Sequence, residues 1–168
     1  MNHRAVEAIS GDHPEFAGIL DNLGFNLLNK YKATGQIDDL ASAIEMFDRA
    51  IEMIPDRHPN LPGYFSNLAA CLRHSFEATG SMEDLERAIY VTRKAFETTP
   101  DADYIALARY LTQLGLYLGY RSEQTDSRDD VDTAIELAER ALEKCPTITK
   151  ASLPCMATLE SGSAASLT

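Results

Sequence analysis

The chain has 168 residues, enough for one ordinary domain, and 45% of them are hydrophobic, which is typical of a folded rather than a disordered protein. Its formal net charge of −11 disfavours binding to nucleic acid or to anionic membrane surfaces, because both need clustered Lys and Arg. This acidity fits a basic or polar peptide partner, and it is equally a common means of staying soluble.

Targeting and redox features favour a reducing compartment. No apolar run approaches the ~20 residues that a membrane span requires. The first residues include Glu7 and lack the apolar stretch of a secretory signal. The cysteines are odd in number, and no two have CxxC spacing, which is typical of unpaired thiols. We therefore expect a cytoplasmic protein that crosses no membrane.

The chain repeats itself at intervals of 45 to 46 residues, and such a period is typical of a solenoid whose units bury their apolar faces against their neighbours. The register predicts three repeats, at residues 13–57, 58–102 and 103–146. Residues 1–12 are then the remnant of a preceding second helix, and 147–168 are a degenerate repeat start with a low-complexity tail. The recurring residues are His13-Pro14 and His58-Pro59; Ala43-Ile44, Ala88-Ile89 and Ala134-Ile135; and Pro55, Pro100 and Pro146.

The first repeat is predicted to be two helices joined by a short turn. The first helix runs from about Pro14 to Ala33, because Pro suits the first helical position and apolar residues follow at helical spacing. Gly35 ends it. A second helix begins near Asp38-Asp39, whose carboxylates cap free N–H groups and complement the helix dipole, and it ends before Pro55. The apolar residues of the first helix are Phe16, Ile19, Leu20, Leu23, Leu27 and Tyr31.

The later repeats follow the same plan. In the second, helices are predicted over about 59–78 and 81–98, and Ser81 with Asp84 resembles a capping box. In the third, helices are predicted over about 103–121 and 127–144, with one inserted residue and no glycine in the turn. After Pro146 the pattern decays, and we expect a short helix at most.

The helices resemble the two halves of a tetratricopeptide repeat. The unit is about 11 residues longer than the ~34 of the common form. This longer form resembles repeats of the kinesin light chain type and arrays attached to caspase-like CHAT domains or nucleotide-binding signalling modules. The resemblance implies an all-α, right-handed superhelical solenoid of antiparallel helix pairs with a peptide-binding concave face. It rests on Ala43, Phe47, Ala50 and Pro55 with their counterparts in later second helices, and on Leu20, Leu23, Gly24 and Leu27 with theirs in first helices.

Asn22, Asn67 and Gln113 occupy the same place in the three first helices. The resemblance puts this place on the concave wall, where polar side chains bind the backbone of an extended peptide. A ladder of amides could do so here, since amides both donate and accept; the alternative is a solvated position on an exposed helix face. Arg73 with His74 could take a ligand carboxylate. The same wall would also hold Asp21, Phe25, Ser66, Thr112 and Tyr120.

We expect no catalytic activity, cofactor or metal, because the chain has no Gly-rich phosphate loop, HExxH or GxSxG motif. The sequence predicts a non-catalytic scaffold that binds a protein or peptide of unspecified identity. The alternative is a regulatory part of a larger signalling or CHAT-type protease protein whose effector domain lies elsewhere. Because neither end supplies a polar capping repeat, we also predict self-association through the repeat ends.

Overall fold

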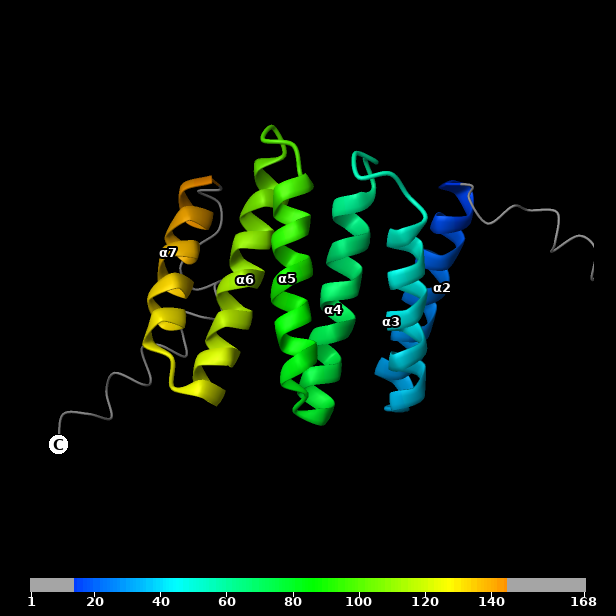
Figure 1. Cartoon of the computed structure of the whole chain (residues 1–168), viewed down its shortest axis with the longest axis horizontal. Helices are drawn as coiled ribbons and strands as arrows, with labels where there is room; N and C mark the ends of the chain where they lie inside the picture. Colours follow the sequence, from blue (N-terminus) through cyan, green and yellow to red (C-terminus); the bar gives the residue numbers. More distant parts are fainter. Residues whose placement is uncertain (1–13, 145–168) are drawn as a thin grey trace, which may run out of the picture. The chain divides into compact units, whose positions relative to one another are not determined.

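The structure, a computed structural model, describes residues 14–144, which form six α-helices and no strand (Figure 1). The prediction of an all-α chain is confirmed for these residues, and the predicted helix ends differ from the observed ones by about one turn at most. The predicted N-terminal remnant and C-terminal tail lie outside the described residues. The helices are α2 (Pro14–Thr34), α3 (Ile37–Glu52), α4 (Leu61–Thr79), α5 (Met82–Thr98), α6 (Tyr104–Thr125) and α7 (Arg128–Lys144).

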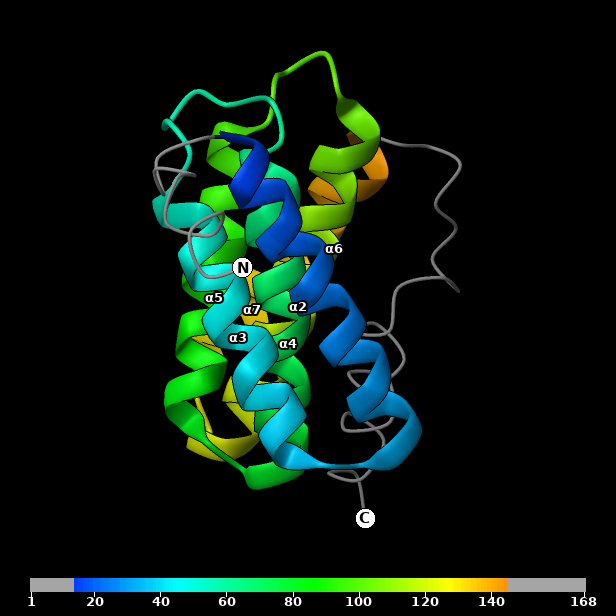
Figure 2. The same cartoon turned by 90° about the vertical axis from the view of Figure 1, so that its right-hand side faces the viewer.

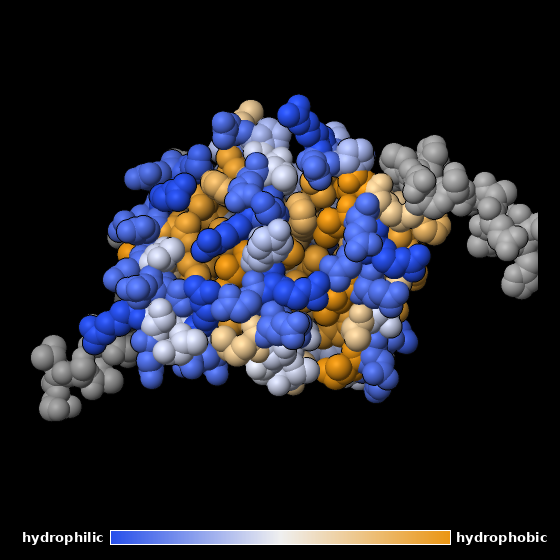
Figure 3. Space-filling model, viewed as in Figure 1, coloured by the Kyte–Doolittle hydropathy of each residue, from blue (hydrophilic) through white to orange (hydrophobic). Residues whose placement is uncertain are grey.

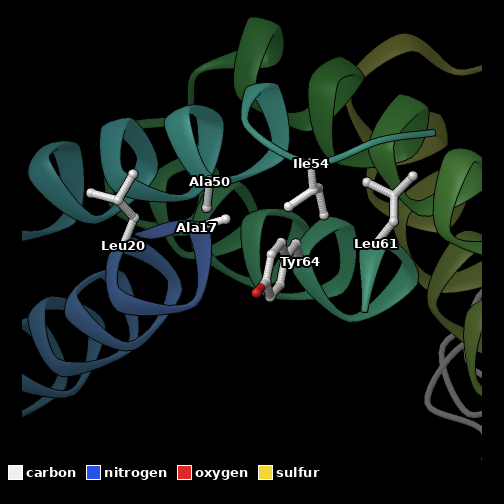
Figure 4. Close-up of a cluster of buried hydrophobic side chains, with 6 residues drawn as sticks. All are labelled: Ala17, Leu20, Ala50, Ile54, Leu61 and Tyr64. Carbon is white, nitrogen blue, oxygen red and sulfur yellow. The ribbon is translucent and has the colours of Figure 1, made fainter. Parts of the chain in front are cut away.

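The chain divides into two compact units, residues 1–84 and 85–168. In the first unit, α3 packs against both α2 and α4, and Figure 2 shows these three helices together. Helix α4 begins at Leu61 rather than at the predicted Pro59, so Pro62 takes the early helical position where a missing N–H does no harm. The three helices share a core cluster of Ala17, Leu20, Ala50, Ile54, Leu61 and Tyr64 (Figure 4).

Two of the residues predicted for the core of α2 are exposed instead. Ile19 and Leu23 keep 58% and 45% of their surface accessible. The buried positions are Ala17, Leu20 and Leu28, which lie on another side of the helix. Apolar residues cover two sides of α2, and α3 covers only one of them. Helical spacing alone does not say which side receives a neighbour.

The second unit has its core between α6 and α7. Ala108 and Leu111 of α6 form a buried cluster with Ala141 of α7, and Phe96 and Leu137 pack against it. Asp103 caps α6, because its carboxylate accepts a hydrogen bond from the Ala106 N–H at 3.1 Å.

The turn after each first helix has the same conformation in all three predicted repeats. Gly35, Gly80 and Asp126 have φ angles of 71°, 73° and 55°. The N–H of each donates to the carbonyl four residues earlier, at 2.7, 2.7 and 2.8 Å. Asp126 therefore occupies the left-handed position of the glycine that the third repeat lacks.

Across each of these turns, a side-chain hydrogen bond joins two residues that are nine positions apart in the sequence. Lys30 donates to Asp39 at 2.6 Å, and Ser75 donates to Asp84 at 2.6 Å. In the third repeat, Arg121 donates to both carboxylate oxygens of Asp130, at 2.6 and 2.8 Å. Asp39 was predicted to cap free N–H groups of α3, but α3 has no side-chain cap hydrogen bond, and the Asp39 carboxylate accepts from Lys30 of the preceding helix instead.

Capping of the second helices comes from serine in two of the three repeats. The Ser81 and Ser127 hydroxyls accept from the N–H groups of Asp84 and Asp130, both at 3.3 Å. Half of the capping box predicted from Ser81 is thus present.

The described helices include none with the length and apolar character needed to cross a membrane. In Figure 3, apolar side chains reach the surface between polar ones over α3 and α4, on the right-hand side of the view.

Candidate functional site

Helices α2 and α4 of the first unit contact each other, and five of the seven predicted binding residues lie on these two helices. Asn22 and Phe25 come from α2, and Asn67, Arg73 and His74 come from α4. Together with Asp21 we call these residues the α2–α4 surface. The other two predicted residues, Gln113 and Tyr120, belong to α6 in the second unit.

A side-chain hydrogen bond between Asp21 of α2 and Asn67 of α4 links the two helices at the α2–α4 surface. The Asn67 amide nitrogen donates to an Asp21 carboxylate oxygen at 2.8 Å. Burial raises the pKa of the Asp21 carboxyl, and the bond from Asn67 offsets part of that rise. Asn67 therefore uses one of its donors within the protein, while its amide oxygen takes no part in this bond and can accept from a ligand.

The basic pair Arg73 and His74 already has an acidic partner. Arg73 Nη1 donates to Glu77 Oε1, and His74 Nδ1 lies 3.2 Å from Glu77 Oε2. Arg73 Nη2 lies 3.1 Å from His74 Nε2. Burial and then the charge of Arg73 lower the pKa of His74, which favours the neutral ring; a neutral ring can accept from Arg73 while donating to Glu77. A ligand carboxylate at this pair would compete with Glu77 for the Arg73 guanidinium.

Two further residues complete this cluster and were not singled out from the sequence. The Tyr31 ring of α2 lies 6.1 Å from the His74 ring at an angle of 51°. The position of Glu77, four residues after Arg73, is the spacing of a helical ion pair and was a usable signal. No sequence signal marks the Tyr31 contact, because it joins two helices that are distant in the chain.

The two α2 residues of the surface are open to solvent. Asn22 is exposed, and Phe25 keeps 50% of its surface accessible. On α6, Gln113 and Tyr120 are half-buried. The Gln113 side-chain oxygen is buried and has no hydrogen-bond partner among the described residues. The predicted ladder thus has three different environments, and Asn22 is its freely accessible amide.

The α2–α4 surface combines an exposed amide, an exposed aromatic ring, an amide–carboxylate bond and a neutralised basic cluster. Such groups can hydrogen-bond a peptide backbone and bury an apolar side chain. No protein-family model matches the chain, and no curated protein matches it either.

Proposed function

We propose that this chain is a tetratricopeptide-like solenoid whose function is to bind a peptide segment of another protein. The repeated hairpin details support the repeat architecture. The left-handed turn residues 35, 80 and 126 and the cross-turn pairs 30–39, 75–84 and 121–130 recur at the sequence period of 45 and then 46 residues. A right-handed superhelix of antiparallel helix pairs is the arrangement that the resemblance implies for such units.

The ligand in this proposal is an extended peptide bound on the α2–α4 surface. The observation that carries it is the exposure of Asn22 and Phe25 on the helix that also supplies Asp21, the partner of Asn67. Asn22 offers donors and acceptors to a peptide backbone, and the Asn67 oxygen adds an acceptor. Phe25 offers an apolar contact to one ligand side chain, since aromatic rings supply much of the energy of protein interfaces.

The chemistry of the surface favours a neutral or basic peptide over an acidic one. Asp21 adds a carboxylate to the surface, and the chain carries a net charge of −11. The guanidinium of Arg73 is neutralised by Glu77. In this proposal the chain holds its ligand without changing it covalently.

The test is a selection of random peptides displayed on phage against the immobilised full chain. A selected peptide is then synthesised, and its dissociation constant is measured by fluorescence anisotropy. We expect the double variant Asn22→Ala/Phe25→Ala to bind at least ~10-fold more weakly, which corresponds to ~1.4 kcal/mol. The control is Ser42→Ala, which removes an exposed polar group from α3.

Two results would overturn the proposal. One is a selection that enriches no peptide above a blank surface. The other is equal affinity of the double variant and the wild type. Mass spectrometry of the recovered peptide provides the check on catalysis, because a peptide that returns cleaved or modified contradicts a purely binding role.

A further inference from the structure

Helices α2 and α4 occupy equivalent places in successive repeats, but their equivalent residues differ sharply in exposure. Ile19 corresponds to Tyr64, and Leu23 corresponds to Leu68. Tyr64 and Leu68 keep only 7% and 2% of their surface accessible, against 58% and 45% for Ile19 and Leu23. We call Phe16, Ile19 and Leu23 the outer face of α2.

The corresponding face at the start of α4 packs against α2, which supplies Ala17 and Leu20, and against the end of α3 with the residues just after it. Ala50 and Ile54 lie in one cluster with Leu61 and Tyr64 (Figure 4). Ile51 and Met53 pack against the same cluster. The part of this cover that comes from the end of α3 and the residues after it therefore spans residues 49–54.

The chain contains a second copy of this covering segment ahead of α2. Residues 4–9 read RAVEAI, and residues 49–54 read RAIEMI. The positions of Ala50 and Ile54 are occupied by Ala5 and Ile9, and the two differences exchange one apolar residue for another. The spacing from Ile9 to Ile19 equals that from Ile54 to Tyr64, so the connecting chain is long enough to place the segment in the same way.

We propose that residues 4–9, which lie outside the described residues, pack on the outer face of α2 and cover Phe16 and Ile19. Ala5 and Ile9 would join Phe16 and Ile19 in one cluster, as Ala50 and Ile54 belong to one cluster with Leu61 and Tyr64. The segment corresponds only to the end of α3, so it leaves Leu23 accessible. Its tether makes the contact intramolecular, and this favours it over a second copy of the chain at ordinary protein concentrations.

The same segment also fits the face by its chemistry. Ala5 presents a small side chain, which allows close approach, while Val6, Ala8 and Ile9 supply apolar surface. Arg4 and Glu7 occupy the positions of Arg49 and Glu52, both of which are exposed. The charged residues of 4–9 thus correspond to exposed residues of 49–54, and the apolar residues of 4–9 correspond to buried or partly buried ones.

The test is disulfide formation between two introduced cysteines in the full chain, with Cys71→Ala, Cys145→Ser and Cys155→Ser as background. In the test variant Ile9→Cys is combined with Ile19→Cys. In the matched control it is combined with Phe25→Cys, which lies at another exposed site on α2. We expect the intramolecular bond to form at least ~10-fold faster in the test variant than in the control, because docking holds only the first pair together.

Equal rates in the two variants would overturn the proposal, since residues 4–9 would then approach both positions on α2 equally often. Disulfide-linked dimers that dominate and increase with protein concentration would also overturn it, because the occupant would then be a second copy. An independent readout is maleimide labelling of Ile19→Cys in the same background. We expect labelling to accelerate at least ~10-fold when Ile9→Asp is added, because the added charge opposes docking on an apolar face, and unchanged labelling would contradict the proposal.

Discussion

Gly24 of α2 lies directly against the ring of Phe47 of α3. A β-carbon built at position 24 would stand 2.9 Å from two carbons of that ring. Phe47 is fully buried, so its ring has little room to move away. The absence of a side chain at position 24 therefore allows α2 to approach α3 closely at Phe47.

We expect Gly24→Ala to lower the free energy of unfolding by about 1–2 kcal/mol, because overpacking outweighs the gain in helix propensity of up to ~1 kcal/mol. Urea denaturation followed by circular dichroism measures the change. Gly63→Ala is the matched control: it lies in helix α4, and a β-carbon there would meet nothing within 4 Å. The control should leave stability unchanged or raise it, and a Gly24→Ala variant that behaves like the control contradicts the packing argument.

Asp126→Gly should stabilise the protein by about 0.5–1 kcal/mol. Asp126 has a φ angle of 55°, which disfavours a side chain, and its negative charge stands at the C-terminal end of α6. The reverse comparison is Gly80→Ala, which places a side chain at a φ angle of 73° and should cost about 1 kcal/mol. Thermal unfolding of both variants measures the two shifts, which must have opposite signs for the interpretation to stand.

The Arg121–Asp130 pair predicts a pH-dependent contribution to stability. Hydrogen bonds from Arg121 lower the pKa of the Asp130 carboxyl, so the unfolded state takes up this proton first as pH falls. The stabilisation is therefore complete above the unfolded pKa and is lost as pH falls through the folded pKa. Asp130→Asn should cost about 1–3 kcal/mol at neutral pH, and the difference from wild type should shrink as pH falls towards ~3.

Urea denaturation of wild type and Asp130→Asn at several pH values tests this prediction. Asp129→Asn is the control, because Asp129 is the exposed neighbour in the same first turn of α7. A constant difference between wild type and Asp130→Asn over the whole acid range would show that the charge of Asp130 is not the source of its effect.

Cys71 should resist thiol reagents in the folded protein. The side chain is buried, and burial raises the pKa of its thiol to about 12. Since the thiolate is the reactive form, alkylation near pH 8 should be roughly a thousandfold slower than for an exposed thiol. Mass spectrometry of native and denatured samples reports labelling at residue 71. An introduced Ser42→Cys, at an exposed position of α3, provides the reactive reference. Rapid labelling of native Cys71 would mean that α4 opens readily.

Residues close together in the chain determined the helices and their repetition. The alternation of apolar residues at helical spacing, Gly35 and Gly80 after the first helices, and proline between repeats are local signals, and they predicted all six described helices. The third repeat shows that the turn conformation matters more than the residue, because Asp126 adopts it where glycine is missing. The period of 45 residues identified equivalent positions such as Asn22 and Asn67, whereas their place on a binding surface was implied by the resemblance and stays a prediction.

Only the tertiary structure decided how these side chains are used. No partner was predicted for the Asn67 amide, which donates a hydrogen bond to Asp21 in the structure. Arg73 and His74 likewise have a partner that was not predicted, Glu77. Ile19 fits a buried stripe as well as its counterpart Tyr64 does, yet only Tyr64 is covered among the described residues. The reason is physical: spacing along a helix fixes the direction of a side chain, whereas burial and pairing depend on which neighbour reaches that side.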